Sequence, residues 1–262
     1  MGGPAARVRT AQDGDVWHIT LDDPSTGNVV DLAMADQLAA AFTARPADAR
    51  AVLLTAAGPR FCVGGDVRAF ATAPDMPAFI GQLAARWHET IRTVLSCAVP
   101  VVAGVHGAVA GAGIGLLGAC DLVVCGRSTK LRPAYGSLGL SPDGGTSWAL
   151  TRALGAPRAL ELLLTDGVLH AADAHTSGLV SRLVDDETLV EESLALARSV
   201  AAGPVRAMVR TRGLVRRAAI RTLDEQLEDE EELIWESAAD PESREGVAAF
   251  LERRPPDFRS TR

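Results

Sequence analysis

Residues 100–125 have the sequence PVVAGVHGAVAGAGIGLLGACDLVVC, and the order of apolar runs and glycines in this stretch decides the fold class. The apolar run Pro100 to Val105 predicts a buried strand, and Asp121 to Cys125 predicts a second one. Between them, the Gly- and Ala-rich stretch predicts a loop that enters a helix. A strand, a loop, a helix and a second strand in this order are the repeat of an α/β core.

The flanking sequence extends this pattern in both directions. Toward the N-terminus we expect strands and helices at Val16–Leu21, Asp31–Ala44, Ala51–Thr55 and Pro77–Ser96. Asp31 suits a helix cap, and Pro77 suits a first helical turn. From residue 146 onward the pattern is almost wholly helical, with helices expected over 146–154, 157–164, 171–177, 187–202, 204–217, 220–239 and 241–251. The predicted division is an α/β core, residues 1–200, and a helical region, residues 201–262.

Composition and charge exclude several classes of protein. A chain of 262 residues with 47% hydrophobic residues can bury a substantial core as one large domain. Its formal net charge is −7, and its acidic and basic residues are interspersed, so no nucleic-acid partner is indicated. No apolar run reaches the roughly 20 residues that span a bilayer. The N-terminal residues lack the apolar core of a signal peptide, so a cytoplasmic protein with no membrane partner is expected.

The cysteines and histidines give no sign of a metal site. Cys62, Cys97, Cys120 and Cys125 lie in apolar surroundings without CxxC spacing, which predicts reduced thiols in the core. The five histidines have no spacing typical of metal ligands. We therefore expect no metal ion.

Two glycine-rich segments are candidates for anion binding. FCVGGD, at Phe61–Asp66, and GAVAGAGIG, at Gly107–Gly115, each place a backbone without bulky side chains beside a helix start. Unpaired N–H groups point outward at a helix start, where the helix dipole favours negative charge. Glycines also serve tight turns and close packing, so that alternative stays open. The second segment lacks the GxGxxG spacing of a dinucleotide site.

These segments resemble the two motifs of the crotonase, or enoyl-CoA hydratase/isomerase, superfamily. FCVGGDVRAF is similar to its F-x-x-G-x-D motif, and residues 100–125 are similar to its second Gly-rich motif. The resemblance continues through residues 131–155, 159–184 and 243–258, in the family's order. It implies a crotonase-like ββα spiral core with a C-terminal helical extension. It also implies an acyl-CoA substrate, no cofactor beyond the CoA of that substrate, and a homotrimer or hexamer assembled through the helices.

The resemblance assigns an oxyanion hole to the backbone N–H groups of Gly65 and Ala112. Two preorganised donors stabilise the negative charge that develops on a thioester oxygen when an enolate forms. Further substrate contacts are implied for Val63, Gly64, Gly111 and Tyr135. Asp66 is expected to cap or pin its loop. For His106, and as an alternative for Tyr135, a core role or a loop-fixing hydrogen bond is expected.

Asp143 is the expected acid/base. Family hydratases carry two glutamates at the positions of Gly115 and Tyr135 here, so the chain lacks the groups that would activate water. Asp143 lies where the 1,2-epoxyphenylacetyl-CoA isomerase-like group has an acid. One carboxylate can remove a proton from one carbon and return it to another, which moves a double bond or rearranges a ring.

Three alternatives to this role stay open. The same Asp serves as the nucleophile in the related 4-chlorobenzoyl-CoA dehalogenase, so hydrolysis or dehalogenation through an acyl-Asp143 intermediate is a second hypothesis. A non-catalytic acyl-CoA-binding accessory subunit is a third. From the residues alone, Asp143 could equally cap the helix that follows it.

For the CoA phosphates the resemblance indicates Arg68, just after the first glycine motif. Asp23 stands where the family usually has a basic residue, and together with Asp22 it would repel phosphate. Phe250, with Arg253 or Arg254, resembles residues of the last helix that reach the CoA of a neighbouring subunit.

Overall fold

The computed structural model describes residues 6–261. Residues 1–5 and 262, at the outer ends of the two predicted domains, lie outside the described residues. Residues 1–5 also begin the N-terminal segment in which no signal peptide was predicted. The fold is the α/β crotonase fold, with two mixed sheets and three C-terminal helices. No helix of residues 6–261 is both long and apolar enough to cross a bilayer.

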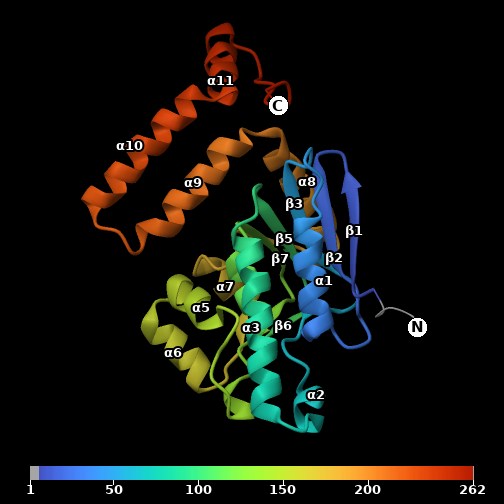
Figure 1. Ribbon diagram of the computed structural model, residues 1–262. Coiled ribbons are helices and arrows are strands. Elements are labelled where there is room, and N and C mark those ends of the chain that lie inside the picture. Colours follow the sequence, from blue (N-terminus) through green and yellow to red (C-terminus); the bar gives the residue numbers. More distant parts are fainter. Residues whose placement is uncertain (1–5, 262) are drawn as a thin grey trace.

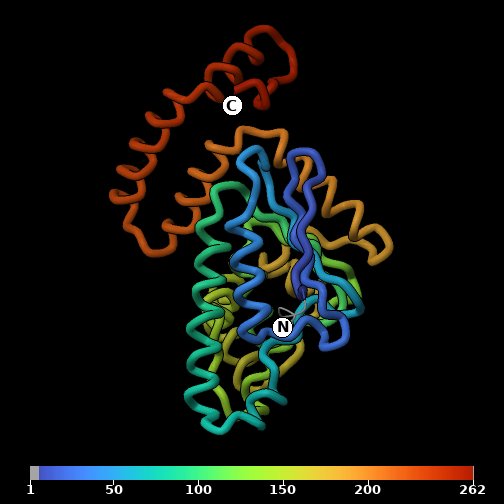
Figure 2. Tube along the Cα trace, turned by 45° about the vertical axis from the view of Figure 1, so that its right-hand side comes forward, coloured from blue at the N-terminus to red at the C-terminus, as the bar shows by residue number. Residues whose placement is uncertain are grey.

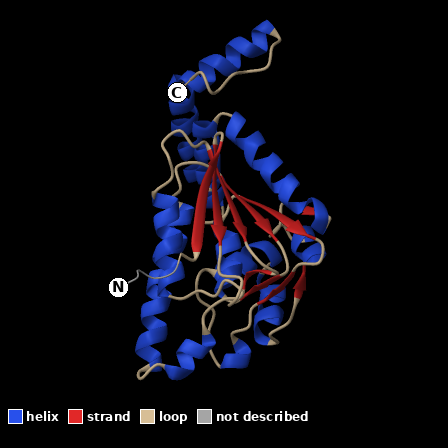
Figure 3. Ribbon diagram, turned by 90° about the vertical axis from the view of Figure 1, so that its right-hand side faces the viewer, coloured by secondary structure: helices blue, strands red, loops and turns tan. Residues whose placement is uncertain are grey.

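The larger sheet has six strands. They are β1 (Val8–Asp13), β2 (Val16–Leu21), β3 (Ala51–Ala56), β5 (Val101–Val105), β7 (Leu122–Gly126) and β10 (Arg182–Val184), and they lie side by side in this order. β1 and β2 are antiparallel and the other neighbours are parallel. Figure 3 shows these strands fanning out between layers of helix. Because β3 and β5 are covered on both faces, their sequences are continuous apolar runs.

The smaller sheet positions the candidate site. Its strands are β4 (Arg60–Cys62), β6 (Ala108–Ala110), β8 (Lys130–Arg132) and β9 (Leu169–His170), and β4, β6 and β8 run parallel. β9 is antiparallel to β8. Parallel neighbours end at the same edge of a sheet, where α/β proteins commonly bind ligands. The segments that follow β4, β6 and β8 therefore converge.

Helices cover both faces of the larger sheet. The helices before the C-terminal region are α1 (Leu32–Thr43), α2 (Val67–Thr72), α3 (Met76–Leu95), α4 (Ala112–Ala119), α5 (Thr146–Leu154), α6 (Ala156–Leu164), α7 (Ala171–Thr176) and α8 (Leu189–Ala202), with short 3-10 turns η1 (Gly136–Leu138) and η2 (Asp186–Thr188). α1 and α3 lie side by side over the main core (Figure 1). α8 covers the opposite face, where Leu53 and Val102 pack against its Leu196.

Two local predictions are confirmed. Asp31 caps α1 by accepting from the Met34 N–H at 2.8 Å. All four cysteines are free and buried.

Two parts of the predicted element order are wrong. No strand was expected after residue 146, but β9 and β10 lie between the expected helices. Strands of two or three residues, held by pairing with β8 and β7, are too short to produce a periodic pattern. The helix expected from residue 220 begins at Leu223, because the side chains of Thr222 and Glu225 form a reciprocal capping box.

The C-terminal helices are α9 (Val205–Ala218), α10 (Leu223–Ala239) and α11 (Pro241–Glu252). Figures 1 and 2 show α10 and α11 extending away from the α/β core, with α9 between them and the sheet. The predicted domain boundary, between residues 200 and 201, falls in the last turn of α8.

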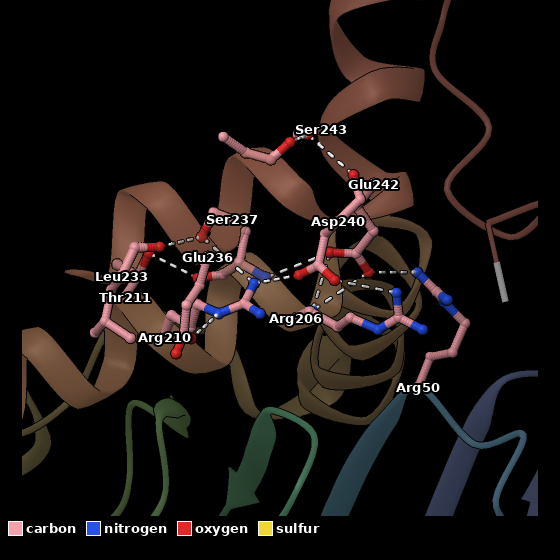
Figure 4. A network of polar contacts seen from close by, with 12 residues as sticks. Arg50, Arg206, Arg210, Thr211, Leu233, Glu236, Ser237, Asp240, Glu242 and Ser243 are labelled. Atoms are coloured by element: carbon pink, nitrogen blue, oxygen red, sulfur yellow. Dashed lines mark hydrogen bonds and ion pairs between the residues drawn. The ribbon is translucent and has the colours of Figure 1, made fainter. Parts of the chain in front are cut away.

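A buried carboxylate attaches these helices to the core (Figure 4). Glu242 is 5% exposed and accepts hydrogen bonds from the N–H groups of Arg206 and Ala207, in the first turn of α9. The Arg50 guanidinium lies 4.0 Å from Glu242 and donates to the carbonyl oxygens of Ala201 and Gly203 at 2.7 Å. Glu242 therefore joins α11, the start of α9 and the core.

We predict that Glu242→Ala lowers the free energy of unfolding by about 3 kcal/mol, because it leaves two helix N–H groups without an acceptor and removes a buried negative charge 4.0 Å from the Arg50 guanidinium. Urea unfolding followed by circular dichroism measures the change. Glu236→Ala is the matched control, since the Glu236 side chain is 44% exposed, and it should change stability by less than about 1 kcal/mol. Equal losses in both variants would contradict this role for Glu242.

Candidate active site

A cavity of about 270 Å³ lies where the ends of β4, β6 and β8 meet α3. We call it the α3 cavity. Its lining residues are mostly apolar and include Val30, Val67, Phe70, Ile80, Leu83, Ala84, Trp87, Ala134, Leu138, Leu140 and Ser141. A larger hollow of about 770 Å³ lies between α9 and the core, but none of the predicted site residues lines it.

Seven of the nine predicted site residues line the α3 cavity: Val63, Gly64, Gly65, Gly111, Ala112, Tyr135 and Asp143. Arg68 and Phe250 do not. Arg68 is an exposed residue of α2, outside the lining. Phe250 is 82% exposed on α11, and Figure 1 shows α11 and α2 at opposite ends of the molecule. Its predicted contact is with a neighbouring subunit, so it stays a prediction.

The two glycine-rich turns approach each other closely. Gly64 has φ +83° and Gly111 has φ +51°, in the left-handed region that favours glycine. A Cβ atom on Gly64 would lie 3.0 Å from the Ala110 oxygen and 3.4 Å from the Gly111 Cα. Glycine at these positions lets two backbones touch where side chains would separate them.

This contact places two N–H groups at the cavity. Within residues 6–261, neither the N–H of Gly65 nor that of Ala112 donates a hydrogen bond. The neighbours of Gly65 are occupied, because Val30 pairs with the Gly64 oxygen and the Asp66 N–H. Ala112 is the first residue of α4, and the first N–H groups of a helix have no intrahelical acceptor. Two N–H groups without an acceptor among the described residues therefore belong to residues that line the cavity.

Asp143 and Tyr135 form a hydrogen-bonded pair in the cavity wall. The Tyr135 hydroxyl donates to Asp143 Oδ1 at 2.7 Å and lies 3.2 Å from Thr146 Oγ1. Burial and the neighbouring charge of Asp143 raise the pKa of Tyr135 far above its ordinary value, so the hydroxyl stays protonated at neutral pH. Asp143 does not cap α5, whose N-cap is Gly145 with no side-chain hydrogen bond. The capping alternative is therefore wrong.

Asp166 fixes the loop that carries Tyr135. Its carboxylate accepts from the Ala134 N–H at 2.6 Å and from the Arg132 guanidinium at 2.8 Å. Burial opposes the charge, but hydrogen bonds from Ser137, Ala134 and Arg132 lower the pKa of Asp166 below its usual value. Ala134 has φ +59°, and this hydrogen bond holds the strained residue in place.

Three further expectations concern side chains outside the cavity lining. Asp66 caps α2, as expected, by accepting from the N–H groups of Arg68 and Ala69. His106 hydrogen-bonds the Gly58 oxygen at 2.7 Å, which is the expected loop-fixing contact.

Asp23 forms an ion pair with Arg7. Burial opposes the charge of Asp23, but hydrogen bonds from Ser25, Thr26 and Arg7 lower the pKa of its carboxyl group. Arg7 thus offsets the charge expected to repel phosphate.

Sequence analysis missed the α3 wall of the cavity. Ile80, Leu83, Ala84 and Trp87 all line it from one face of α3. Their spacing of three and four residues is the signal of a buried helical face, but that spacing does not separate a cavity wall from core packing. Phe70 completes this wall and packs edge-on against Phe79, with ring centroids 6.2 Å apart.

Gly115 has a steric role that its sequence position did not reveal. A Cβ atom at Gly115 would lie 1.9 Å from the Gly144 oxygen and 2.7 Å from the Gly144 carbonyl carbon. α4 and the Asp143 loop are therefore in backbone contact at this point. A glutamate at position 115 could not fit without moving the loop that carries Asp143.

Fold and cavity together define an α/β protein in which two backbone turns and one carboxylate converge. Residues 11–261 match the model of the enoyl-CoA hydratase/isomerase family. The chain belongs to this family, the crotonase superfamily, and is an acyl-CoA enzyme of it.

Individual relatives carry two kinds of name. The chain is 36% identical to 1,2-epoxyphenylacetyl-CoA isomerase of Escherichia coli, covering 93% of this chain and 94% of that protein. It is 35% identical to a probable enoyl-CoA hydratase of Rhodobacter capsulatus, covering 92% and 93%. The crystal structure of an enoyl-CoA hydratase from Polaromonas superposes with a TM-score of 0.91 at 31% identity, covering 95% of this chain and 98% of that one.

We predict that Gly115→Ala lowers the free energy of unfolding by about 1 to 3 kcal/mol, because the added methyl group must displace the Gly144 carbonyl. In an open helix interior the same change raises stability by up to about 1 kcal/mol. Gly81→Ala in α3 is the matched control, since nothing lies within 4 Å of its added Cβ. Urea unfolding compares the two, and a stabilised Gly115→Ala protein would show that the contact is absent.

Proposed function

We propose that this protein is an acyl-CoA isomerase that moves a double bond, or rearranges a ring, through a thioester enolate. The N–H groups of Gly65 and Ala112 form its oxyanion hole, and Asp143 is its acid/base. One observation carries the proposal. Asp143 is the only carboxylate among the described residues that line the α3 cavity, and the two N–H groups without an acceptor belong to the same lining.

The proton balance needs only this one carboxylate. Asp143 removes a proton from C2 of a 3-enoyl thioester, and the electron pair moves onto the carbonyl oxygen as a dienolate. The two N–H groups stabilise that charge, each contributing about 3 kcal/mol to the barrier reduction. Asp143 then returns the proton to C4, which leaves the double bond between C2 and C3.

The Tyr135 hydroxyl fixes which carboxylate oxygen reacts. It donates to Oδ1 of Asp143, and among residues 6–261 no donor reaches Oδ2, so Oδ2 is the oxygen that takes and returns the proton. Since Tyr135 keeps its own proton, its role is to orient Asp143 and not to exchange protons with the substrate.

The relatives' names divide between isomerase and hydratase, and the cavity favours the first. A hydratase must hold and activate a water molecule. Family hydratases carry glutamates at two positions that are Gly115 and Tyr135 here. Gly115 is packed against the Gly144 oxygen, and the Tyr135 hydroxyl donates its hydrogen bond to Asp143. Arg68, exposed in α2 beside the first glycine turn, is the proposed contact for a CoA phosphate.

Asp143→Asn should lower kcat for 3-enoyl-CoA isomerisation by at least about 100-fold, because general acid–base catalysis typically contributes 10²- to 10⁴-fold. KM should change little, since the oxyanion hole is intact. Ultraviolet absorbance of the conjugated product follows the reaction, with Asp173→Asn on α7 as a surface control.

Three results would contradict this mechanism. The first is an Asp143→Asn protein with parental turnover. The second is an intact mass showing an acyl-enzyme on Asp143, which would favour hydrolysis or dehalogenation. The third is binding of CoA esters by the parent without turnover of any 3-enoyl thioester, which would favour an accessory subunit.

We also propose that residues 201–262 form a trimerisation region. Ile220, Leu223, Trp235 and Phe250 in this region are 72 to 82% exposed, and apolar side chains this exposed are typical of a surface buried by a partner. Light scattering should give the mass of three or six chains. Trp235→Glu together with Phe250→Glu should shift the mass to one chain, whereas a monomeric parent would refute the proposal.

A further inference from the structure

The peptide that follows Asp143 is held by α3 from one side and by α4 from the other. Gly144 has φ +61°, and a Cβ atom on it would lie 2.8 Å from the Trp87 indole. Its carbonyl oxygen packs against Gly115 of α4. Its N–H donates to Nε2 of His88 at 3.0 Å. Among the described residues, His88 is thus the one side chain that accepts from the Gly144 N–H, while the Tyr135 hydroxyl contacts the Asp143 oxygen at the other end of this peptide.

That hydrogen bond determines the tautomer of the neutral imidazole. Because the Gly144 N–H is a donor, Nε2 of His88 must present a lone pair, and the ring proton of a neutral histidine then lies on Nδ1. His88 is half-buried on α3, one helical turn after Ala84 and next to Trp87, both of which line the cavity. The imidazole itself is not part of that lining.

The Asp143 side chain depends on contacts before and after it. On one side the Tyr135 hydroxyl contacts Oδ1 and the backbone oxygen of Asp143, at 2.7 and 3.2 Å. On the other side the Gly144 N–H is tied to α3 through His88. The Asp143 oxygen of this peptide also accepts from the Thr146 N–H at 3.0 Å. Without His88, the Gly144 N–H loses its acceptor, and the peptide can tilt about these remaining bonds because two left-handed glycines follow it. Such a tilt would shift the carboxylate.

We infer that His88 is a positioning residue for Asp143, acting through the Gly144 peptide and not through the substrate. The inference rests on the proposed function, because in it His88 holds the Asp143 carboxylate, the proposed acid/base, within reach of the substrate carbon. A displacement of about 1 Å at a reacting group can cost about 100-fold in rate. Loss of the Nε2 acceptor should therefore lower kcat and leave KM unchanged.

His88→Leu and His88→Gln form the test pair, since the glutamine amide oxygen can accept from the Gly144 N–H and leucine cannot. With a 3-enoyl-CoA thioester, His88→Leu should lower kcat about 10- to 100-fold at unchanged KM. His88→Gln should recover most of that loss. His175→Leu is the matched control, because it also removes an imidazole that is hydrogen-bonded to the backbone, in this case to the Val180 oxygen outside the cavity. It should leave kcat unchanged.

The nitrogen-15 NMR spectrum of the parent protein provides a readout independent of activity. The His88 imidazole should show an unprotonated Nε2 and a protonated Nδ1. A protonated Nε2 overturns the inference even if His88→Leu fails to fold. Parental kcat in His88→Leu overturns it as well. So does a His88→Gln protein as slow as His88→Leu, since the imidazole would then have a role beyond accepting from Gly144.

Asp143→Asn separates this inference from the proposed function. If Asp143→Asn abolishes turnover while His88→Leu keeps it, only the positioning role fails. If Asp143→Asn keeps turnover, the proposed function fails, whatever the spectrum of His88 shows.

Discussion

The contact between the backbones at Gly64 and Gly111 is the constraint on which the rest of the site depends. The two turns can touch because both residues lack a side chain and have positive φ. The parallel pairing of β4 with β6 delivers the turns to the same sheet edge. The residues that follow, Gly65 and Ala112, then line the same cavity with N–H groups that no described residue accepts. Any side chain at the contact would separate them.

The remaining wall is built around this contact by backbone packing. The Asp143 loop is held between α3 and α4, with the Gly144 oxygen against Gly115 and the Gly144 Cα against Trp87. The third parallel strand, β8, leads into the loop whose Tyr135 orients the Asp143 carboxylate. Residues that carry two N–H groups without an acceptor among the described residues, and one carboxylate, thereby line one largely apolar volume of about 270 Å³. In such a volume electrostatic stabilisation is stronger than in water.

The sequence predicted the parts of this arrangement that have local signals. Apolar runs located β2, β3 and β5, and the glycine motifs located both backbone turns, because left-handed turns and close contacts select glycine. Strands β9 and β10 were missed because their short pairings are set by tertiary contacts. The bond between Tyr135 and Asp143 crosses a 3-10 turn, and the bond from Gly144 to His88 spans 56 residues. No local pattern indicates either one. The steric role of Gly115 also became visible only once α4 and the Asp143 loop were placed together.

The most direct test is a crystal structure of the Asp143→Asn protein with a 3-enoyl-CoA thioester bound. The thioester oxygen should lie about 3 Å from the backbone nitrogens of both Gly65 and Ala112, with C2 of the acyl chain facing the substituted side chain at position 143. A thioester oxygen bound elsewhere, or bonded to only one of the two nitrogens, would contradict the oxyanion hole and the enolate chemistry assigned to it.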